Sequence, residues 1–161
     1  MKRLFTLVSL SSVVVFLAGC AITRTPTVTA NPNGGFTTNV VVSVNQTALS
    51  FDCLAVQAVV SLGAQQVVQH DPNSTAVIHD IERALSSTLS GANHADASTI
   101  IGLVGASNAS PVTQSQITQL VQYVSNAEQA LIQKYGVTVA GQVTLAIVKS
   151  VLAGLTQVVP L

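Results

Sequence analysis

Apolar residues recur at intervals of three and four along most of this chain, a spacing that is typical of amphipathic helices. Five stretches show it: residues 47–69, 71–90, 93–106, 110–135 and 139–159. A period of two appears between Phe36 and Asn45, where the β-branched residues predict a strand. We therefore expect a mainly α domain, a small bundle of four or five helices with a short N-terminal β-strand.

The ends of the helices carry recognisable signals. Asp71-Pro72 and Ser110-Pro111 each place a capping side chain before a proline that suits the first helical position. Gly91 and Gly136 follow the last periodic residues and predict helix ends. The expected core faces are Phe51, Leu54, Ala55, Ala58, Val59 and Leu62 in the first helix, Ile78, Ile81, Leu85 and Leu89 in the second, and Ile117, Leu120, Val121, Val124, Ala127, Leu131 and Tyr135 in the fourth.

Two of the helical stretches are less regular. The third contains Gly102 and Gly105, which lower its helix propensity and are expected to mark close packing of a neighbour. The fifth, residues 139–159, is apolar on most sides, but Lys149 at its centre would cost about 3 kcal/mol on membrane insertion. We prefer a buried bundle helix; the alternatives are a membrane-inserting or pore-lining helix and a packing surface for another copy. Ser150-x-x-x-Gly154 would allow close helix approach in each case.

The strand needs a partner, because a single strand is not stable alone. Gly136–Val139 is the best internal candidate, and a partner chain is the alternative. The preceding segment, Ala21–Gly35, is rich in Thr, Pro, Asn and Gly and shows no apolar period. We expect it to be a flexible tether with a reach of about 20 Å.

The first twenty residues have the form of an export signal. Lys2 and Arg3 precede an apolar run that begins at Leu4 and ends in Leu17-Ala18-Gly19-Cys20. This box resembles the cleavage box of bacterial lipoproteins, which implies that Cys20 becomes the lipid-bearing first residue of the mature chain. The alternative is an uncleaved membrane helix, for which about 17 residues is the low edge of a spanning length.

This resemblance implies a location and a domain organisation. We expect a signal peptide over residues 1–19, the lipidated Cys20 and the tether over 20–36, and a helical domain over 37–161. The resemblance also implies attachment to the membrane by several acyl chains, such as palmitate, on Cys20. Ala21 stands where many Gram-negative bacteria use Asp to hold a lipoprotein at the inner membrane. In such a host the analogy favours the outer membrane. It does not distinguish the periplasmic face of that membrane from the outer face.

Charge is sparse and narrows the range of partners. Only 7% of the residues are charged and the formal net charge is zero, against roughly 25% charged residues in an average globular protein. No basic run remains after the signal, so nucleic acid is not an expected partner. The polar surface must consist of Gln, Ser, Thr and Asn, which suits self-association or a partner that covers much of it.

Few side chains are candidates for chemistry. Cys53 would be alone once Cys20 is acylated; it fits a small apolar core residue, and a reactive thiol or intermolecular disulfide is the sharper alternative. His79, His94 and Asp96 belong to a cluster of ionisable residues, but their spacing matches no recognised metal site, so they are weak metal candidates. We identify no catalytic motif and expect no cofactor. We therefore expect that the protein is not an enzyme.

Two functions follow from these observations. The first is a non-catalytic interaction or structural role, in which an envelope lipoprotein binds another envelope protein or itself. The alternative is a binding module for a small hydrophobic ligand, seated between the last two helices, or for a metal ion. The sequence names neither the partner nor the ligand.

Overall fold

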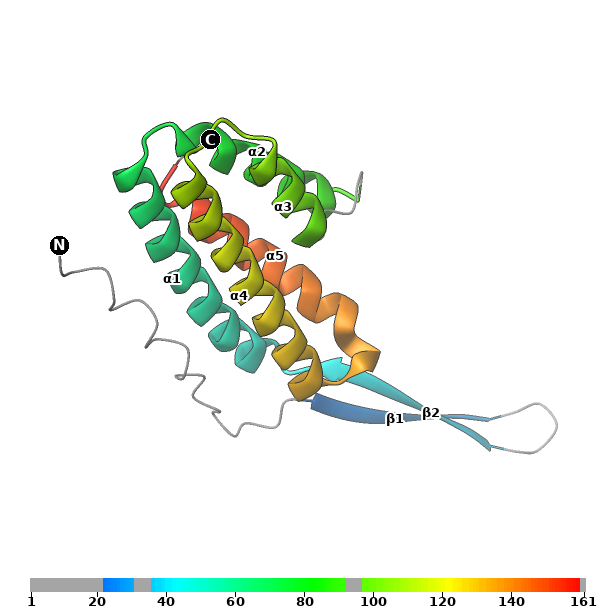
Figure 1. Cartoon of the computed structure of the whole chain (residues 1–161). Helices are drawn as coiled ribbons and strands as arrows, with labels where there is room; N and C mark the ends of the chain where they lie inside the picture. Colours follow the sequence, from blue (N-terminus) through cyan, green and yellow to red (C-terminus); the bar gives the residue numbers. More distant parts are fainter. Residues whose placement is uncertain (1–21, 31–35, 92–96, 160–161) are drawn as a thin grey trace.

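The computed structural model describes residues 22–30, 36–91 and 97–159. Within them, five α-helices form a small bundle with a β-hairpin on its N-terminal side (Figure 1). The elements are β1 (Ile22–Ala30), β2 (Phe36–Val44), α1 (Gln46–His70), α2 (Ser74–Leu89), α3 (Ala97–Gly105), α4 (Pro111–Tyr135), the 3-10 helix η2 (Val137–Val139) and α5 (Ala140–Thr156). The expected mainly α bundle is confirmed.

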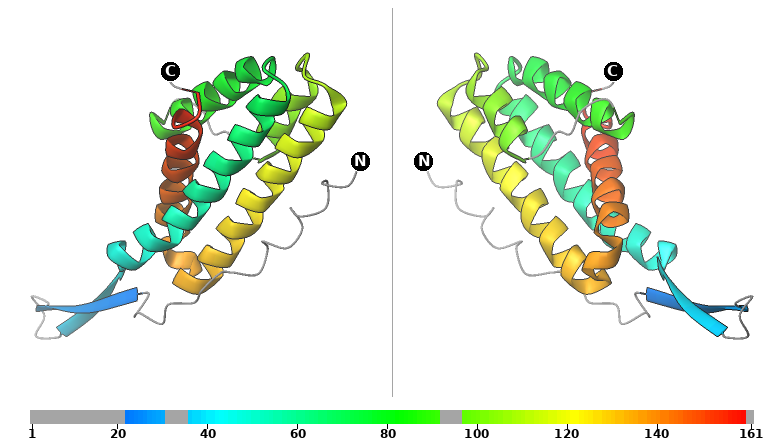
Figure 2. Two further views of the ribbon diagram at one scale, coloured as in Figure 1. Left: turned by 90° about the vertical axis from the view of Figure 1, so that its left-hand side faces the viewer. Right: turned by 90° about the vertical axis from the view of Figure 1, so that its right-hand side faces the viewer.

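Three long helices, α1, α4 and α5, form the body of the bundle, and α2 and α3 lie across its upper end (Figures 1 and 2). α1 and α5 run in the same direction, and α4 runs against them. Asp52 near the start of α1 accordingly accepts a hydrogen bond from Tyr135 at the end of α4. Gly136, with φ of 95°, and η2 make the tight turn from α4 into α5.

The expected core faces of the second and fourth helices are largely confirmed. All the residues of these two expected faces are buried or half-buried, and the buried ones include Ile78, Ile81 and Leu85 on α2 and Tyr135 on α4. α5 buries one face, formed by Val143, Ile147, Val151, Gly154 and Leu155, and leaves Lys149 exposed. By length and composition alone, Gln46–His70 and Val137–Thr156 are apolar enough to cross a membrane. In the fold these two helices pack against each other.

The expected core face of α1 is wrong. Phe51, Leu54 and Leu62 are 59%, 54% and 56% exposed, and Ala55 and Ala58 are not part of the buried core. The core instead takes Leu49, Cys53, Val56, Val60, Ala64 and Val67. α1 is apolar on nearly all sides, so its sequence offers two stripes at helical spacing. Packing against α4 and α5 buries one of these stripes. The spacing of apolar residues alone does not show which stripe that will be.

Gly154 brings α5 close to α1. A Cβ at this position would lie 2.8 Å from the backbone oxygen of Gln57 and 3.1 Å from the side chain of Val60. The close approach expected from Ser150-x-x-x-Gly154 is therefore confirmed at its glycine. The same expectation for Gly102 and Gly105 is wrong, because a Cβ at either position would meet no atom of the described residues within 4 Å.

Within the segment that we expected to be a flexible tether, Ile22–Ala30 forms β1 instead. β1 pairs with β2 in an antiparallel register that sets Ile22 opposite Val44 and Val28 opposite Thr38. Gly136–Val139 is therefore not the partner strand. Threonine, which fills alternate positions of β1, favours extended backbone without any apolar alternation, and this explains why the strand is missed. In Figure 1 the hairpin projects away from the lower end of the bundle.

Some helix ends differ from expectation. Ser110 caps α4 as expected, its Oγ accepting from the backbone N–H of Thr113, and Gly91 has φ of 74° just after α2. Asp71, in contrast, does not cap α2, which begins at Ser74. Residues 1–21, with the proposed signal peptide, Cys20 and Ala21, lie outside the described residues, as do residues 92–96.

Candidate functional site

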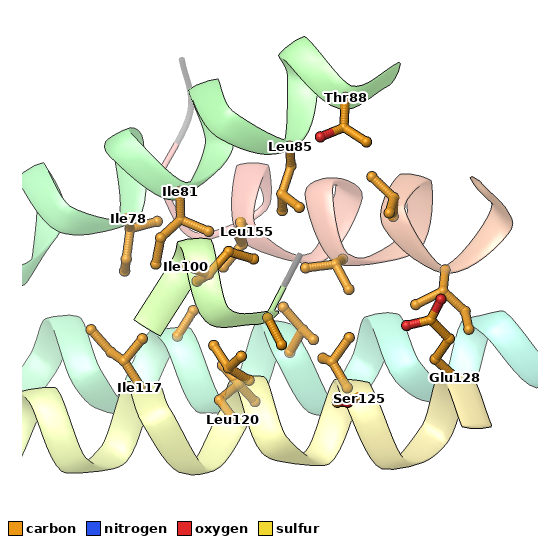
Figure 3. A pocket seen from close by; sticks show the side chains of 18 of the residues that line it. Ile78, Ile81, Leu85, Thr88, Ile100, Ile117, Leu120, Ser125, Glu128 and Leu155 are labelled. Carbon is orange, nitrogen blue, oxygen red and sulfur yellow. The ribbon is translucent and has the colours of Figure 1, made fainter. Parts of the chain in front are cut away.

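An apolar cavity of about 330 Å³ lies among all five helices and is partly open to the surface (Figure 3). α2 and α4 form facing walls, and α3 lies between them over one part of the space. The side chains that line it come from α1 (Val60, Ala64, Val67), α2 (Ile78, Ile81, Leu85, Thr88), α3 (Ala97, Ser98, Ile100), α4 (Ile117, Leu120, Val121, Val124, Ser125, Glu128) and α5 (Thr144, Ile147, Val148, Val151, Leu155). Protein interiors seldom leave so much space, so the cavity is the main candidate site.

The lining is almost entirely aliphatic, with polar groups gathered toward one end. Ile78 and Ile117 lie at one end of the view in Figure 3, and Thr88, Ser125 and Glu128 lie at the other. Thr144 on α5 donates a hydrogen bond from Oγ1 to Glu128 Oε1 at 2.5 Å. Glu128 is the only ionisable side chain among the described residues that line the cavity.

Sequence reasoning missed Glu128. The buried or half-buried positions of α4 include Ile117, Val121, Val124, Leu131 and Tyr135, which are spaced by steps of three, four and seven. Residue 128 lies four positions after Val124 and three before Leu131, which is the spacing of the buried face. Glu128 therefore places a carboxylate at a core-facing position. The face expected from the sequence included Ala127 and omitted its charged neighbour, because only apolar residues were counted. The unbroken spacing was the available signal.

A second polar cluster centres on Asp71, where α1 meets α2. Asp71 Oδ1 accepts from the backbone N–H of Asn73 at 3.1 Å. Asp71 Oδ2 accepts from the backbone N–H of Ser110 at 3.3 Å and from Thr113 Oγ1 at 3.0 Å. These bonds to Ser110 and Thr113, together with the one from Asn73, hold the pKa of Asp71 below its ordinary value. The cluster joins the first corner of the bundle to the start of α4.

A third cluster joins the opposite end of α4 to α1. Asp52 Oδ2 accepts from Lys134 Nζ at 2.7 Å and from Tyr135 Oη at 2.6 Å. Tyr135 is completely buried, and burial together with its bond to Asp52 raises its pKa. Neither this cluster nor the one at Asp71 lines the cavity, so we interpret both as structural.

The metal candidates are placed as follows. His79 lies on α2, and its Nδ1 is 3.0 Å from Oε2 of the fully buried Glu82. His94 and Asp96 lie outside the described residues. Within residues 22–30, 36–91 and 97–159, no three His, Cys, Asp or Glu side chains come together as a metal site would need. The other oxygen of Glu82, Oε1, has no hydrogen-bond partner in this part of the chain.

Cys53 is buried on α1, with 4% of its surface exposed. Burial raises the pKa of its thiol, while the hydroxyl of Ser150 acts against that rise. A buried, protonated thiol packs as a small apolar group. This position suits the core interpretation better than the reactive-thiol alternative.

Comparison with known proteins returns no match among family models, curated proteins or solved structures.

Proposed function

We propose that this chain is a lipid-anchored cell-envelope protein whose helical domain holds a small hydrophobic ligand. The cavity of about 330 Å³ carries the proposal. Ligand sites in proteins have volumes of about 300–1,000 Å³ and apolar walls with a few polar groups, and this cavity has both features. The ligand site lies among all five helices and not only between the last two.

The envelope location rests on Leu17-Ala18-Gly19-Cys20. The membrane is then one partner, held through the acyl chains on Cys20, and Ala21 favours the outer membrane in a Gram-negative host. The proposed role is non-catalytic. Among the described residues that line the cavity, one is a carboxylate and none is a histidine, lysine or cysteine that could act beside it, and this favours a binding role.

Filling the cavity tests the proposal directly. Val124→Phe places a ring in the cavity from α4, and Val112→Phe makes the same change at an exposed position of that helix. We would measure binding of the small neutral fluorescent dye naphthalene, whose ten carbon atoms suit the cavity volume, and identify co-purifying lipids by mass spectrometry. Val124→Phe should reduce dye binding at least about tenfold, because it occupies the dye's space, and Val112→Phe should leave it unchanged. Equal binding by both variants would refute the proposal.

Interaction with another envelope protein, or with a second copy, is a second candidate function. The exposed apolar stripe on α1, formed by Phe51, Leu54 and Leu62, favours it. In-cell crosslinking of the lipidated protein, followed by mass spectrometry, should recover a stoichiometric partner or the chain itself. Leu54→Gln should weaken that crosslink, while Val112→Gln on α4 should not. A crosslink that Leu54→Gln leaves intact would count against this stripe.

A further inference from the structure

The polar end of the cavity indicates which head group a ligand would carry. Glu128 brings a carboxylate to a space whose described lining is otherwise aliphatic side chains and the hydroxyl groups of Ser and Thr (Figure 3). Its hydrogen bond comes from Thr144, and within the described residues no Lys, Arg or His lies within ion-pair distance of it. A carboxylate has about four acceptor sites, so Glu128 retains capacity for donors from a ligand.

Charge separates the classes of ligand. An acidic amphiphile would place a second negative charge beside Glu128 in a poorly solvated space, which is unfavourable. An amine would supply donors and the opposite charge in one group. The amino end of α3 also reaches the cavity, through Ala97 and Ser98. A helix N-terminus carries a partial positive charge, which would favour an acidic ligand. Its partial charge is roughly half a unit, smaller than the full charge of Glu128.

Volume limits the length of the ligand. An engineered cavity of about 150 Å³ lined by apolar residues binds benzene. The cavity here, at about 330 Å³, is roughly twice that size. It therefore suits about a dozen non-hydrogen atoms, which corresponds to one medium-length alkyl chain and a small head group.

Resting on the function proposed above, we propose that the cavity binds a single-chain amphiphile with a cationic amine head group. Glu128 receives the amine, Thr144 orients the carboxylate, and the aliphatic side chains at the other end surround the alkyl chain. Glu128 thereby selects amines over acids of the same chain length.

Three probes of matched length test this selectivity: decylamine, decanol and decanoate. We would measure their binding at pH 7 by calorimetry, below their micelle concentrations, to the mature chain with Cys20→Ser. That chain has no acyl groups and retains every described residue. Decylamine should bind about tenfold or more tightly than decanoate, the size expected for a hydrogen-bonded charge pair.

Glu128→Gln should reduce the preference for decylamine to within about twofold, because Gln keeps an acceptor for Thr144 but loses the charge. Asp80→Asn removes the same charge from an exposed position on α2 and should leave the preference intact. Equal binding of the three probes, tighter binding of decanoate, or a preference that Glu128→Gln does not change would overturn this inference alone. Failure of all three probes to bind would overturn the proposed function as well.

Discussion

Asp71 connects three segments through one side chain. It accepts hydrogen bonds from Asn73 just before α2, and from Ser110 and Thr113 at the start of α4. The pair Asp71-Pro72 predicts a helix start with Asp71 as its cap, but α2 begins at Ser74 and Asp71 bonds elsewhere. The partners at residues 110 and 113 lie 39 and 42 positions away. Local patterns do not encode such contacts, so they could not be predicted.

Asp71 should make stability depend on pH. Its folded-state pKa is lowered, so its contribution is present above the unfolded value of 3.8 and is lost as pH falls through the folded value. Asp71→Asn should therefore be less stable than the parent at pH 7, and the difference should shrink toward pH 3. Urea unfolding across this range measures it. Asp80→Asn, from an exposed ion pair, should show little effect at either pH; a constant deficit in Asp71→Asn would contradict the assignment.

The pair of His79 and Glu82 should respond asymmetrically to substitution. Glu82 is completely buried, and His79 Nδ1 is the group beside its Oε2. His79→Ala should lower the free energy of unfolding by about 2 kcal/mol, because it leaves a buried acceptor oxygen of Glu82 without its hydrogen-bond partner. Glu82→Leu removes that carboxylate and should be within about 1 kcal/mol of neutral, or stabilising. Chemical denaturation at neutral pH measures both, and a larger loss in Glu82→Leu would contradict this view.

At the scale of elements, the sequence predicts where the helices begin and end far better than which face of each helix is buried. Ser110, Gly91 and Gly136 locate their helix ends because capping and left-handed turns are local effects. The buried face of α1 depends on which neighbours it meets, and its exposed Phe51 is as apolar as its buried Val56. The strand β1 escapes prediction because pairing with β2, and not its own pattern, stabilises it.

Contact between α1 and α5 should tolerate no added methyl at Gly154. Gly154→Ala places a Cβ 2.8 Å from the backbone oxygen of Gln57, so the helices must separate. We expect a loss of about 1–3 kcal/mol in unfolding free energy. Gly102→Ala, where a Cβ meets nothing, should instead gain up to about 1 kcal/mol from helix propensity. Denaturant unfolding of both variants tests the contact, which is refuted if Gly154→Ala is also stabilising.

At the scale of the whole molecule, we expect only the cavity to accept a larger side chain without loss of stability. Val124→Phe adds bulk where space exists and should change the unfolding free energy of the ligand-free chain by less than about 1 kcal/mol. Val56→Phe adds the same bulk in the core of α1, away from the cavity, and should cost about 1–3 kcal/mol. Equal losses in the two variants would mean that the cavity closes in solution.

No pattern in a single sequence predicts this cavity. It forms where side chains from all five helices come together without filling the space between them, and that arrangement is set by the complete fold. The sequence did suggest a hydrophobic ligand as an alternative, from the apolar character of the last helices. The location and the single carboxylate at Glu128 required the structure.

The hairpin would also give a lipid-anchored form of the protein a mechanical property. If Cys20 is held in a membrane, a pull on the domain reaches β1 at Ile22, directly opposite Val44, where β2 leads into α1. Loaded at these adjacent ends, the strands would unzip one bonded pair at a time and not shear together. The segment from Ile22 to Val44 would then extend by about 75 Å while the helices stay folded. The hairpin would thus supply extra chain length under load, so that the helical domain could move away from the membrane while Cys20 stays in it.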